Sequence, residues 1–433
     1  MSEFFEIAYA AASKRLCLFT GTGFSKAVSE NSAPSWQELL ELVCEQTSSP
    51  VALKAALFPT NTPAPLSLEE AAQVIELELK KVDKSIHAEV ASIIGGLRIQ
   101  GDNVAVREFL SVNSLDIVTT NYDLLLESLC GTNAVHSLTP GLPVPRSDSR
   151  VRIFHVHGSI KYSAGMVVTS EDYFKFSSGE SYFSRKLSTI LHENTVVILG
   201  YSLGDANLKS IINEYKGFSK AHVIASNIFL VSRSKVTQPI KDYYYHCYGI
   251  RVIDGLEVRD FFVRLNFLMP TVLPCVDGSI QRLMTAYFQG VEYTSDYLRS
   301  ENSFYEIVSS LSAVGASINN PTIVGLMGRV IEAKIRLTGE NQAWQQYAHL
   351  ASWLVYLGTI LEIKGTSIEE VFLLAVRKSM TTMSSMGLHG YSWDAYVTWS
   401  TKWNNVISSN RLMIKRSIES NFITGDACNV VRL

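Results

Sequence analysis

The sequence has few cysteines and no close spacing among them. Its six cysteines are scattered over 433 residues, with no C-x-x-C pair and no cluster of cysteine and histidine at zinc spacing. The spacing therefore predicts neither a disulfide scaffold nor a structural zinc site. Each cysteine is interpreted as a buried, reduced thiol.

The sequence also has little excess of charge of either sign. Lysine and arginine number 38 against 41 aspartates and glutamates, which gives a net charge of −3. Proteins that bind nucleic acid directly are normally basic, so direct nucleic-acid binding is not expected from the overall charge, and a local basic patch stays open. Hydrophobic content of 47% with 18% charged residues is typical of a globular protein, and the length suggests two or three domains.

A leader sequence and a membrane span are not expected either. The N-terminal stretch MSEFFEIAYAAASKR carries acidic residues early and lacks a basic region followed by a long apolar run, so the expected location is the cytoplasm. Residues 341–361 carry no formal charge over about the length of a membrane span, but three glutamines and His349 lie among them. Because unpaired amides are costly in hydrocarbon, we expect a buried helix there and no membrane partner.

Short apolar runs alternate with helical patterns over the first 270 residues. The predicted strands are residues 16–20, 116–120, 152–157, 195–199, 227–231 and 250–253, and the predicted helices are residues 35–46, 66–82, 103–112 and 181–193. The strands are apolar on both faces, as in a parallel sheet covered on both sides. This alternation predicts a doubly wound α/β domain.

The alternation of strand and helix patterns ends after the sequence VLPCVDGS, and from about residue 280 the pattern is helical throughout. We therefore expect a catalytic domain over residues 1–272 and a helical C-terminal domain over 273–433, with Pro270 and Pro274 near the boundary. Trp399 and Trp403 are one helical turn apart and share a face. Core packing is the favoured interpretation of that face, and a surface for assembly or a partner is the alternative.

Polar or glycine-rich segments follow four of the predicted strands. In a doubly wound sheet the ligand lies beyond the carboxyl ends of the strands, so these segments should converge on one crevice. The four segments are Gly21-Thr22-Gly23, Thr120-Asn121-Tyr122-Asp123, His157-Gly158-Ser159 and Gly200-Tyr201-Ser202-Leu203-Gly204-Asp205.

The first segment, within TGTGFSKA, is a glycine turn between a strand and a helix. Such a turn exposes backbone amides that suit a phosphate, and a turn serving only the fold is the alternative. The dinucleotide-binding fingerprint and the P-loop both need a glycine at position 26, which is Lys26 here. Both of those phosphate sites are therefore excluded.

The other segments offer groups for catalysis and ribose binding. Asn121 and Asp123 bring an amide and a carboxylate to the crevice, although helix capping alone would explain Asp123. His157 is placed to act as a general base, while His155, two positions earlier, fits a core histidine better than a metal ligand. Gly200, Ser202 and Asp205 supply close backbone, a hydroxyl and a carboxylate of the kind that bind ribose.

Taken in order, these segments resemble the sirtuin-like family. TGTGFS is similar to its phosphate turn, TTNYD to its Thr-x-Asn-x-Asp segment, HVHGS to its His-Gly and GYSLGD to its Gly-Ser segment, and IFLVSRS and YGIRVIDG are similar to its closing strands. The resemblance covers about residues 10–268 and implies a Rossmann-like NAD site. It implies that Gly21, Thr22, Gly23 and Ser25 hold the pyrophosphate. It also implies that Asn121 and Asp123 orient the nicotinamide ribose and an attacking water, with His157 as the base.

Two stretches differ from the protein-deacylating sirtuins and indicate which branch of the family the chain resembles. The zinc ribbon of the protein-deacylating sirtuins is replaced by SIKYSAGMVVTSEDYFKF, and their Gly-Ile-Pro-x-Phe-Arg stretch by NSAPSWQELL. The chain then resembles the sirtuin-like NAD hydrolases of bacterial antiphage defence, which implies cleavage of NAD to ADP-ribose and nicotinamide and abortive infection. In this branch NAD is the substrate and no metal is required.

The same resemblance implies a homo-oligomer and, as a possible partner, a HerA-type hexameric ATPase. Assembly or a partner would activate the hydrolase. Two other functions stay open at this stage: a sensor module that binds NAD or ADP-ribose without cleaving it, and an NAD-dependent protein deacylase.

Overall fold

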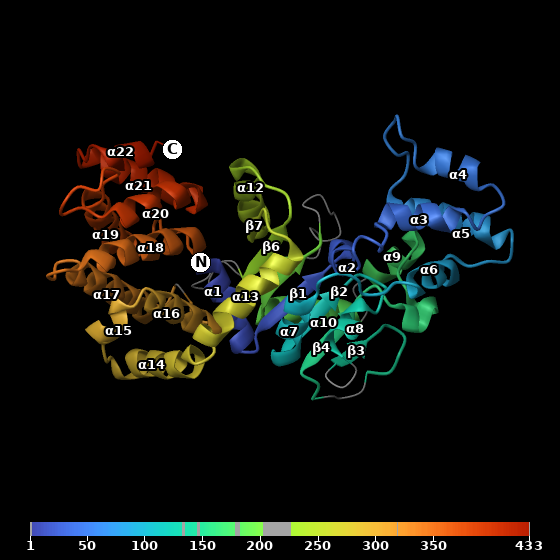
Figure 1. Cartoon of the computed structure of the whole chain (residues 1–433), viewed down its shortest axis with the longest axis horizontal. Helices are drawn as coiled ribbons and strands as arrows, with labels where there is room; N and C mark the ends of the chain where they lie inside the picture. The colour runs from blue at the N-terminus through green and yellow to red at the C-terminus, as the bar shows by residue number, and fades with distance from the viewer. Residues whose placement is uncertain are drawn as a thin grey trace.

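The core of the molecule is a parallel sheet of seven strands. A computed structural model describes residues 2–131, 135–144, 148–177, 182–201, 227–317 and 319–432. The strands are β1 (Leu16–Thr20), β2 (Leu115–Thr119), β3 (Val135–Leu138), β4 (Val151–His155), β5 (Thr195–Leu199), β6 (Ile228–Ser232) and β7 (Ile250–Asp254). Their order across the sheet is β3-β4-β2-β1-β5-β6-β7, and every pair is parallel. The predicted fold class, a Rossmann-like sheet followed by helices, is confirmed (Figure 1).

The central strands have the burial that their sequence predicts. All five residues of β1, β2 and β5 are buried, because helices cover both faces of the sheet. The bounds of β1 and β5 match the prediction, and β2 and β6 are displaced by one residue. One strand, β3, was not predicted. It is a four-residue edge strand that contains His136 and Ser137, so the sequence has no apolar run from which to predict it.

Helices surround the sheet and extend beyond both of its edges. In the first part of the chain they are α1 (Ser2–Ala12), α2 (Thr22–Val28), α3 (Trp36–Cys44), α4 (Pro50–Leu57), α5 (Leu68–Lys80), α6 (Ile86–Gly95), α7 (Val104–Val112), α8 (Leu125–Cys130), the 3₁₀ helix η1 (Ile160–Gly165), α9 (Ser170–Ser177), α10 (Tyr182–Glu193), α12 (Gln238–Tyr248) and α13 (Val258–Val272).

Helices α3 to α6 form a lobe at one end of the molecule, on the right of Figure 1. Helices α3 and α5 each begin with a capping box, formed by Ser35 with Glu38 and by Ser67 with Glu70. The lobe has its own hydrophobic core, which includes Tyr122 from the segment after β2. The Tyr122 hydroxyl donates to the carbonyl of Val167, 2.6 Å away. Packing of Tyr122 in this core therefore holds the lobe beside the carboxyl ends of the strands.

The rest of the chain is helical in the described residues, as predicted. Its elements are α14 (Cys275–Gln289), α15 (Ser295–Arg299), α16 (Asn302–Ala313), α17 (Pro321–Leu337), α18 (Trp344–Ile360), α19 (Glu369–Thr381), α20 (Trp393–Lys402), the 3₁₀ helix η2 (Trp403–Asn405), α21 (Ser408–Ser420) and α22 (Asp426–Val430). No helix of the described ranges is long and apolar enough to cross a bilayer. Residues 341–361 largely form α18, in which Gln346 is buried.

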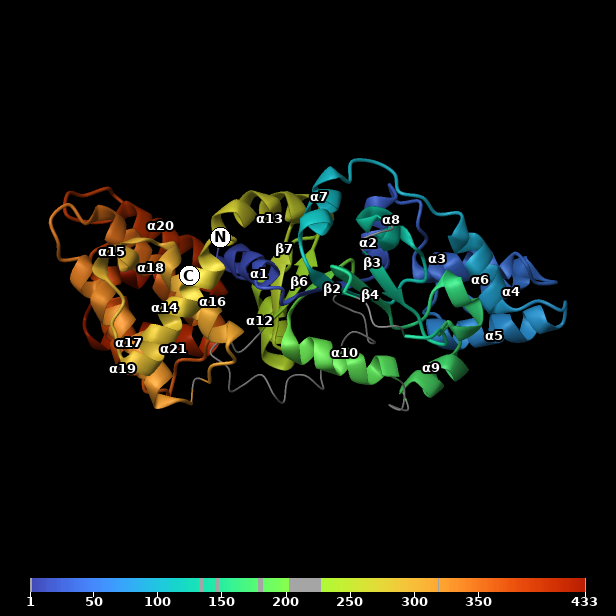
Figure 2. The same ribbon diagram turned by 90° about the horizontal axis from the view of Figure 1, so that it is seen from below.

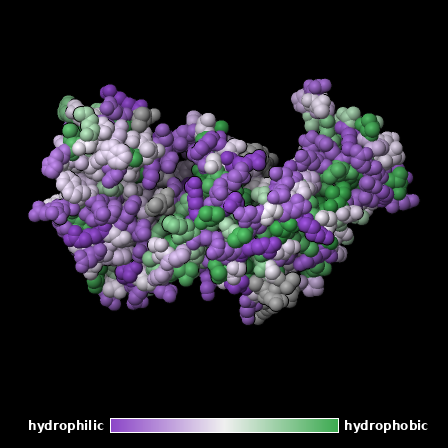
Figure 3. Space-filling view, in the orientation of Figure 1, coloured by the Kyte–Doolittle hydropathy of each residue, from purple (hydrophilic) through white to green (hydrophobic). Residues whose placement is uncertain are grey.

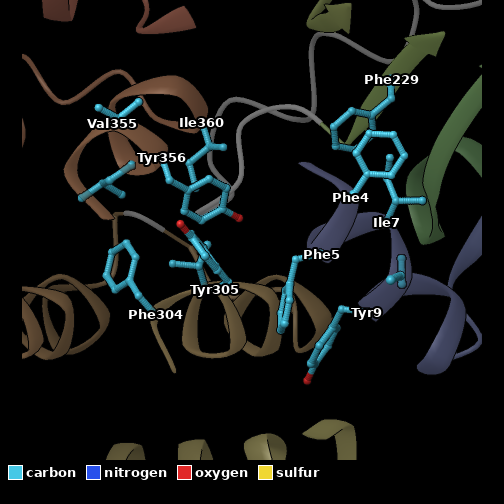
Figure 4. Packing of buried hydrophobic residues seen from close by; sticks show 14 of the residues in the cluster. Phe4, Phe5, Ile7, Tyr9, Phe229, Phe304, Tyr305, Val355, Tyr356 and Ile360 are labelled. Atoms are coloured by element: carbon cyan, nitrogen blue, oxygen red, sulfur yellow. The ribbon is translucent and has the colours of Figure 1, made fainter. Parts of the chain in front are cut away.

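The first helix, α1, lies between the sheet and the C-terminal helices (Figures 1 and 2). Figure 4 shows Phe5 of α1 facing Tyr305 of α16, and the ring centroids of the two residues are 5.8 Å apart. One buried hydrophobic cluster runs from the sheet through α1 and α13 into the helices after residue 273. Pro270 lies inside the last turn of α13 and Pro274 precedes α14. The division at 272/273 stays a prediction.

The tryptophan pair belongs to this core. Trp399 is fully buried and Trp403 nearly so, with ring centroids 6.4 Å apart. The alternative interpretation of this pair as an exposed partner surface was therefore wrong. Trp344 and Trp393, in contrast, are about half exposed.

Candidate functional site

The polar strand ends meet at one cavity of about 330 Å³, beside the helical lobe. Of the predicted residues, Thr22, Ser25, Asn121, Asp123, His157 and Gly200 line this cavity. Gly21 and Gly23 lie in the turn behind it, and Ser202 and Asp205 lie outside the described residues. Trp36 and Leu39 close the cavity from α3, and Tyr173 closes it from α9. Its volume is at the small end of the range for ligand sites.

The glycine turn packs tightly against the end of β5. Gly200 has a φ of +77°, and a Cβ there would lie 2.0 Å from the amide nitrogen of Phe24. The amides of Gly21 and Gly23 donate to the carbonyls of Leu199 and Gly200, both at 2.9 Å. These two amides are therefore engaged, and the expectation that the turn leaves them bare was wrong. Among the described residues, no acceptor is found for the Thr22 amide.

Ser25 joins the two polar residues that follow β2. The Ser25 hydroxyl donates to Oδ2 of Asp123 at 2.7 Å and accepts from Nδ2 of Asn121 at 2.8 Å. A hydroxyl has one proton, and Ser25 gives it to the carboxylate, so the Asn121 atom facing it must be the donor nitrogen. This leaves Oδ1 of Asn121 as an acceptor at the cavity, suited to a water molecule or a ribose hydroxyl.

Asp123 is both a cap and part of this network. Its Oδ1 accepts from the backbone amide of Leu125 at 3.0 Å, so the capping interpretation accounts for one oxygen only. The side chain is buried, and burial raises the pKa of Asp123 against the opposing hydrogen bonds from Ser25 and Leu125. The carboxylate is therefore held by two donors at the base of the cavity.

His157 lies beyond the end of β4, in the turn that leaves the sheet. Its ring makes edge contacts with Tyr173 and Phe176, with centroids 5.3 Å and 5.1 Å away. Only 4% of the residue is exposed, and burial lowers the pKa of His157 to about 4. The imidazole is therefore neutral near pH 7, and the same burial makes it a weaker base than an exposed histidine.

His155 points elsewhere, as its core interpretation predicts. The strand prediction extended to residue 157, but β4 ends at His155, so the two histidines do not share a strand face. The His155 ring is fully buried between the backbone carbonyl of Asn121 and the carboxylate of Glu127. In the described part of the chain, no group of three or more histidine, cysteine or acidic side chains is placed to hold a metal ion.

Two residues of the site were not predicted as site residues, although Tyr201 stands in one of the four predicted segments. Glu127 sits in α8 and accepts from His155 and from Ser137. Tyr201 directly follows Gly200, and its hydroxyl lies 2.6 Å from the hydroxyl of Thr120. Its ring covers the turn, since a Cβ on Gly21 would lie 2.6 Å from it. The convergence of the Thr120 and Tyr201 segments was predicted, but neither spacing nor residue type alone could predict these particular hydrogen bonds.

Residues 116–253 match the family model described as "SIR2-like domain". The chain carries a SIR2-like domain. The match includes Asn121, Asp123, Glu127, His155 and His157, and β1 with its glycine turn lies before it. A SIR2-like domain implies the use of NAD.

A curated relative supports the same family. The chain is 24% identical to "Defense-associated sirtuin 2" of Bacillus subtilis over 158 residues, which are 35% of this chain. The matched stretch spans 16% of the length of that protein. The SIR2-like domain of this chain is thus distantly homologous to part of a much longer defence-associated protein.

Proposed function

We propose that this protein is an NAD hydrolase, which cleaves NAD to ADP-ribose and nicotinamide. One observation carries the proposal. The Ser25, Asn121 and Asp123 network and the neutral imidazole of His157 line the same cavity of a SIR2-like domain. A module that only binds NAD would need neither an oriented amide nor a base there.

The residues can divide the reaction among them. The bond between ribose C1′ and the nicotinamide nitrogen breaks, and its electron pair leaves with nicotinamide. Oδ1 of Asn121 accepts a hydrogen bond from the attacking water and orients the water oxygen toward C1′. The new bond forms between that water oxygen and C1′. His157, neutral in this site, accepts the proton that the water loses. Thr22 and Gly200 also line the cavity, and we propose that the Thr22 amide and the turn at Gly200 bind the phosphate end.

The biological role that fits this chemistry is antiphage defence by depletion of NAD. The link to defence comes from the name of the Bacillus subtilis relative, which is a much longer protein. An unrestrained NAD hydrolase would harm its own cell, so we propose that assembly into a homo-oligomer or contact with a partner controls it. A HerA-type hexameric ATPase is the partner that we propose.

A protein deacylase and an NAD sensor, the two alternative functions, would give different products from an NAD hydrolase. A deacylase consumes NAD only with an acylated peptide, and a sensor leaves NAD intact. Purified protein, with and without co-purifying partner, is incubated with NAD alone and with NAD plus an acetylated peptide, and nicotinamide and ADP-ribose are quantified. We expect both products without peptide.

Variants assign the activity to this cavity. Asn121→Ala and His157→Ala should each lower turnover by about 100-fold or more, because each removes a group that acts on the water. Asn61→Ala and His389→Ala change exposed residues of the same types and should leave it unchanged. Intact NAD under every condition, with partner and phage trigger supplied, would contradict the proposal.

A further inference from the structure

The backbone of Asn121 is held by side chains rather than by the sheet. Strand β2 ends at Thr119, two residues earlier. The amide of Asn121 donates to Oγ1 of Thr119 at 3.1 Å. Its carbonyl accepts from Nδ1 of His155 at 3.1 Å. The peptide that carries the reactive amide therefore depends on two neighbouring side chains for its position.

His155 is itself fixed from its other side. Its Nε2 lies 3.0 Å from Oε1 of Glu127, and the histidine is fully buried. Glu127 also accepts from the Ser137 hydroxyl at 2.7 Å, and its carboxylate lies 3.6 Å from Nζ of Lys161. The contacts thus run from Glu127 through His155 to the carbonyl of Asn121.

Both neighbours of the His155 ring are hydrogen-bond acceptors. A backbone carbonyl can only accept, and an ionised carboxylate can only accept. Burial opposes the charge of Glu127, but its hydrogen bond with His155 and the charge of that ring together lower the pKa of Glu127. Both ring nitrogens of His155 therefore face acceptors, and Nδ1 donates to the carbonyl of Asn121.

We propose that His155, oriented by Glu127, is a positioning residue for the NAD cleavage proposed above. It fixes the carbonyl of Asn121, and thereby the direction in which the Asn121 side chain presents Oδ1 to the water. His155 does not line the cavity, and it acts only through Asn121. The effect of His155 on NAD cleavage rests on the proposed function. Its positioning of the Asn121 carbonyl is independent of that function.

Two substitutions separate the two contacts of His155. The amide nitrogen of asparagine is bonded to Cγ, as is Nδ1 of histidine, so His155→Asn keeps a donor for the carbonyl of Asn121. The amide nitrogen of glutamine lies one bond further out, near the place of Nε2, so His155→Gln keeps the contact with Glu127 and loses the one with Asn121. Both variants remove part of a buried ring, which makes each the control for the other in stability.

The expected kinetic result is a difference in kcat. His155→Gln should lower kcat by about 10- to 100-fold with little change in KM, because misplacing a group that acts on the water weakens the transition state more than substrate binding. His155→Asn should keep kcat within about threefold of the native protein. Thermal unfolding of both variants is measured alongside, and we expect similar midpoints.

Hydrogen–deuterium exchange tests the positioning without any turnover. Peptides that cover residues 116–125 should exchange faster in His155→Gln than in the native protein, and not in His155→Asn. Equal exchange and equal kcat in both variants would overturn the inference. If the native protein does not cleave NAD, the proposed function fails, and the exchange result still decides whether His155 positions Asn121.

Discussion

At the scale of single residues, the site depends on one hydroxyl. Ser25 Oγ is the atom through which α2 contacts both Asn121 and Asp123. Without it, the amide of Asn121 can rotate, and Asp123 loses a hydrogen bond that lowers its pKa. These two hydrogen bonds connect helix α2 to the segment after β2.

Removing that hydroxyl should impair catalysis more than stability. We expect Ser25→Ala to lower kcat for NAD cleavage by about 10- to 100-fold, because the Asn121 amide is no longer oriented. Ser310→Ala in α16 is the matched control, since Ser310 is also fully buried and donates to a backbone carbonyl. Steady-state kinetics of the two variants measure the difference. An unchanged kcat in Ser25→Ala would show that the network does not orient Asn121.

The second prediction concerns the pH dependence of the proposed base. Burial lowers the pKa of His157 to about 4, so the imidazole is neutral, and active, from pH 6 to pH 8. The kcat/KM profile reports the free enzyme and should be flat over that range, with its acidic limb below about pH 5. Because burial raises the pKa of Asp123, the profile is compared with that of Asp123→Asn. A limb centred near pH 6.5 would contradict the buried placement of His157.

The sequence predicts some of these residues and not others for a physical reason. Ser25, Asn121, Asp123 and His157 stand just after apolar strands, and polar groups at the carboxyl ends of parallel strands must share one edge. Glu127 lies within a helix, where an acidic residue normally faces solvent. Only the three-dimensional placement of α8 against β4 reveals that it faces His155.

At the scale of elements, continuous burial made the strands predictable but left helix α1 without a periodic pattern. The strands were predicted closely because two-sided burial gives continuous apolar runs. Helix α1 was not predicted, because most of its residues are buried and it shows no polar face with a helical period. The uncharged α18 was predicted as a buried helix, and its Gln346 accepts a hydrogen bond from Lys334.

Lys334 of α17 gives an element-scale prediction about stability. It is fully buried, donates to the carbonyl of Leu298 and to Gln346, and lies 4.2 Å from the ring centroid of Trp353. Burial lowers the pKa of Lys334 to about 7, with nearby Glu301 opposing the shift. Above that pH the unfolded chain binds a proton that the folded chain lacks, so the free energy of unfolding contributed by this group rises with pH.

Urea unfolding at several pH values measures this contribution. Between about pH 7 and about pH 10, the free energy of unfolding of Lys334→Met should rise less with pH than that of the native protein. Lys364→Met changes an exposed lysine and should reproduce the native pH dependence. The same pH dependence in all three proteins would refute a lowered pKa for Lys334.

At the scale of the whole molecule, α1 joins the sheet to the C-terminal helices through Glu6. Its carboxylate accepts from both terminal nitrogens of Arg251 on β7 and, at 3.2 Å, from the hydroxyl of Tyr356 on α18. All three side chains are buried, and the Arg251 guanidinium lies 4.1 Å from the ring centroid of Phe229. Beside this junction is a cavity of about 730 Å³, seen as a hollow between α12 and the C-terminal helices in Figure 3.

Breaking this junction should cost more than breaking any surface ion pair. Glu6→Gln leaves the Arg251 charge buried without its carboxylate, so we expect a loss of about 3–5 kcal/mol in the free energy of unfolding. Tyr356→Phe removes one hydrogen bond and should cost about 1 kcal/mol. Glu171→Gln, at an exposed pair with Lys175, is the control. A cost for Glu6→Gln no larger than that of the control would show that the junction does not stabilise the fold.

The central claim is that this SIR2-like domain breaks the glycosidic bond of NAD with water. The most direct measurement is the amount of free ADP-ribose and nicotinamide formed per NAD consumed, without peptide and with assembly partner and phage trigger supplied. The account predicts one of each product per NAD, and almost none from Asn121→Ala. Intact NAD under these conditions, or the same yield from Asn121→Ala, would contradict it.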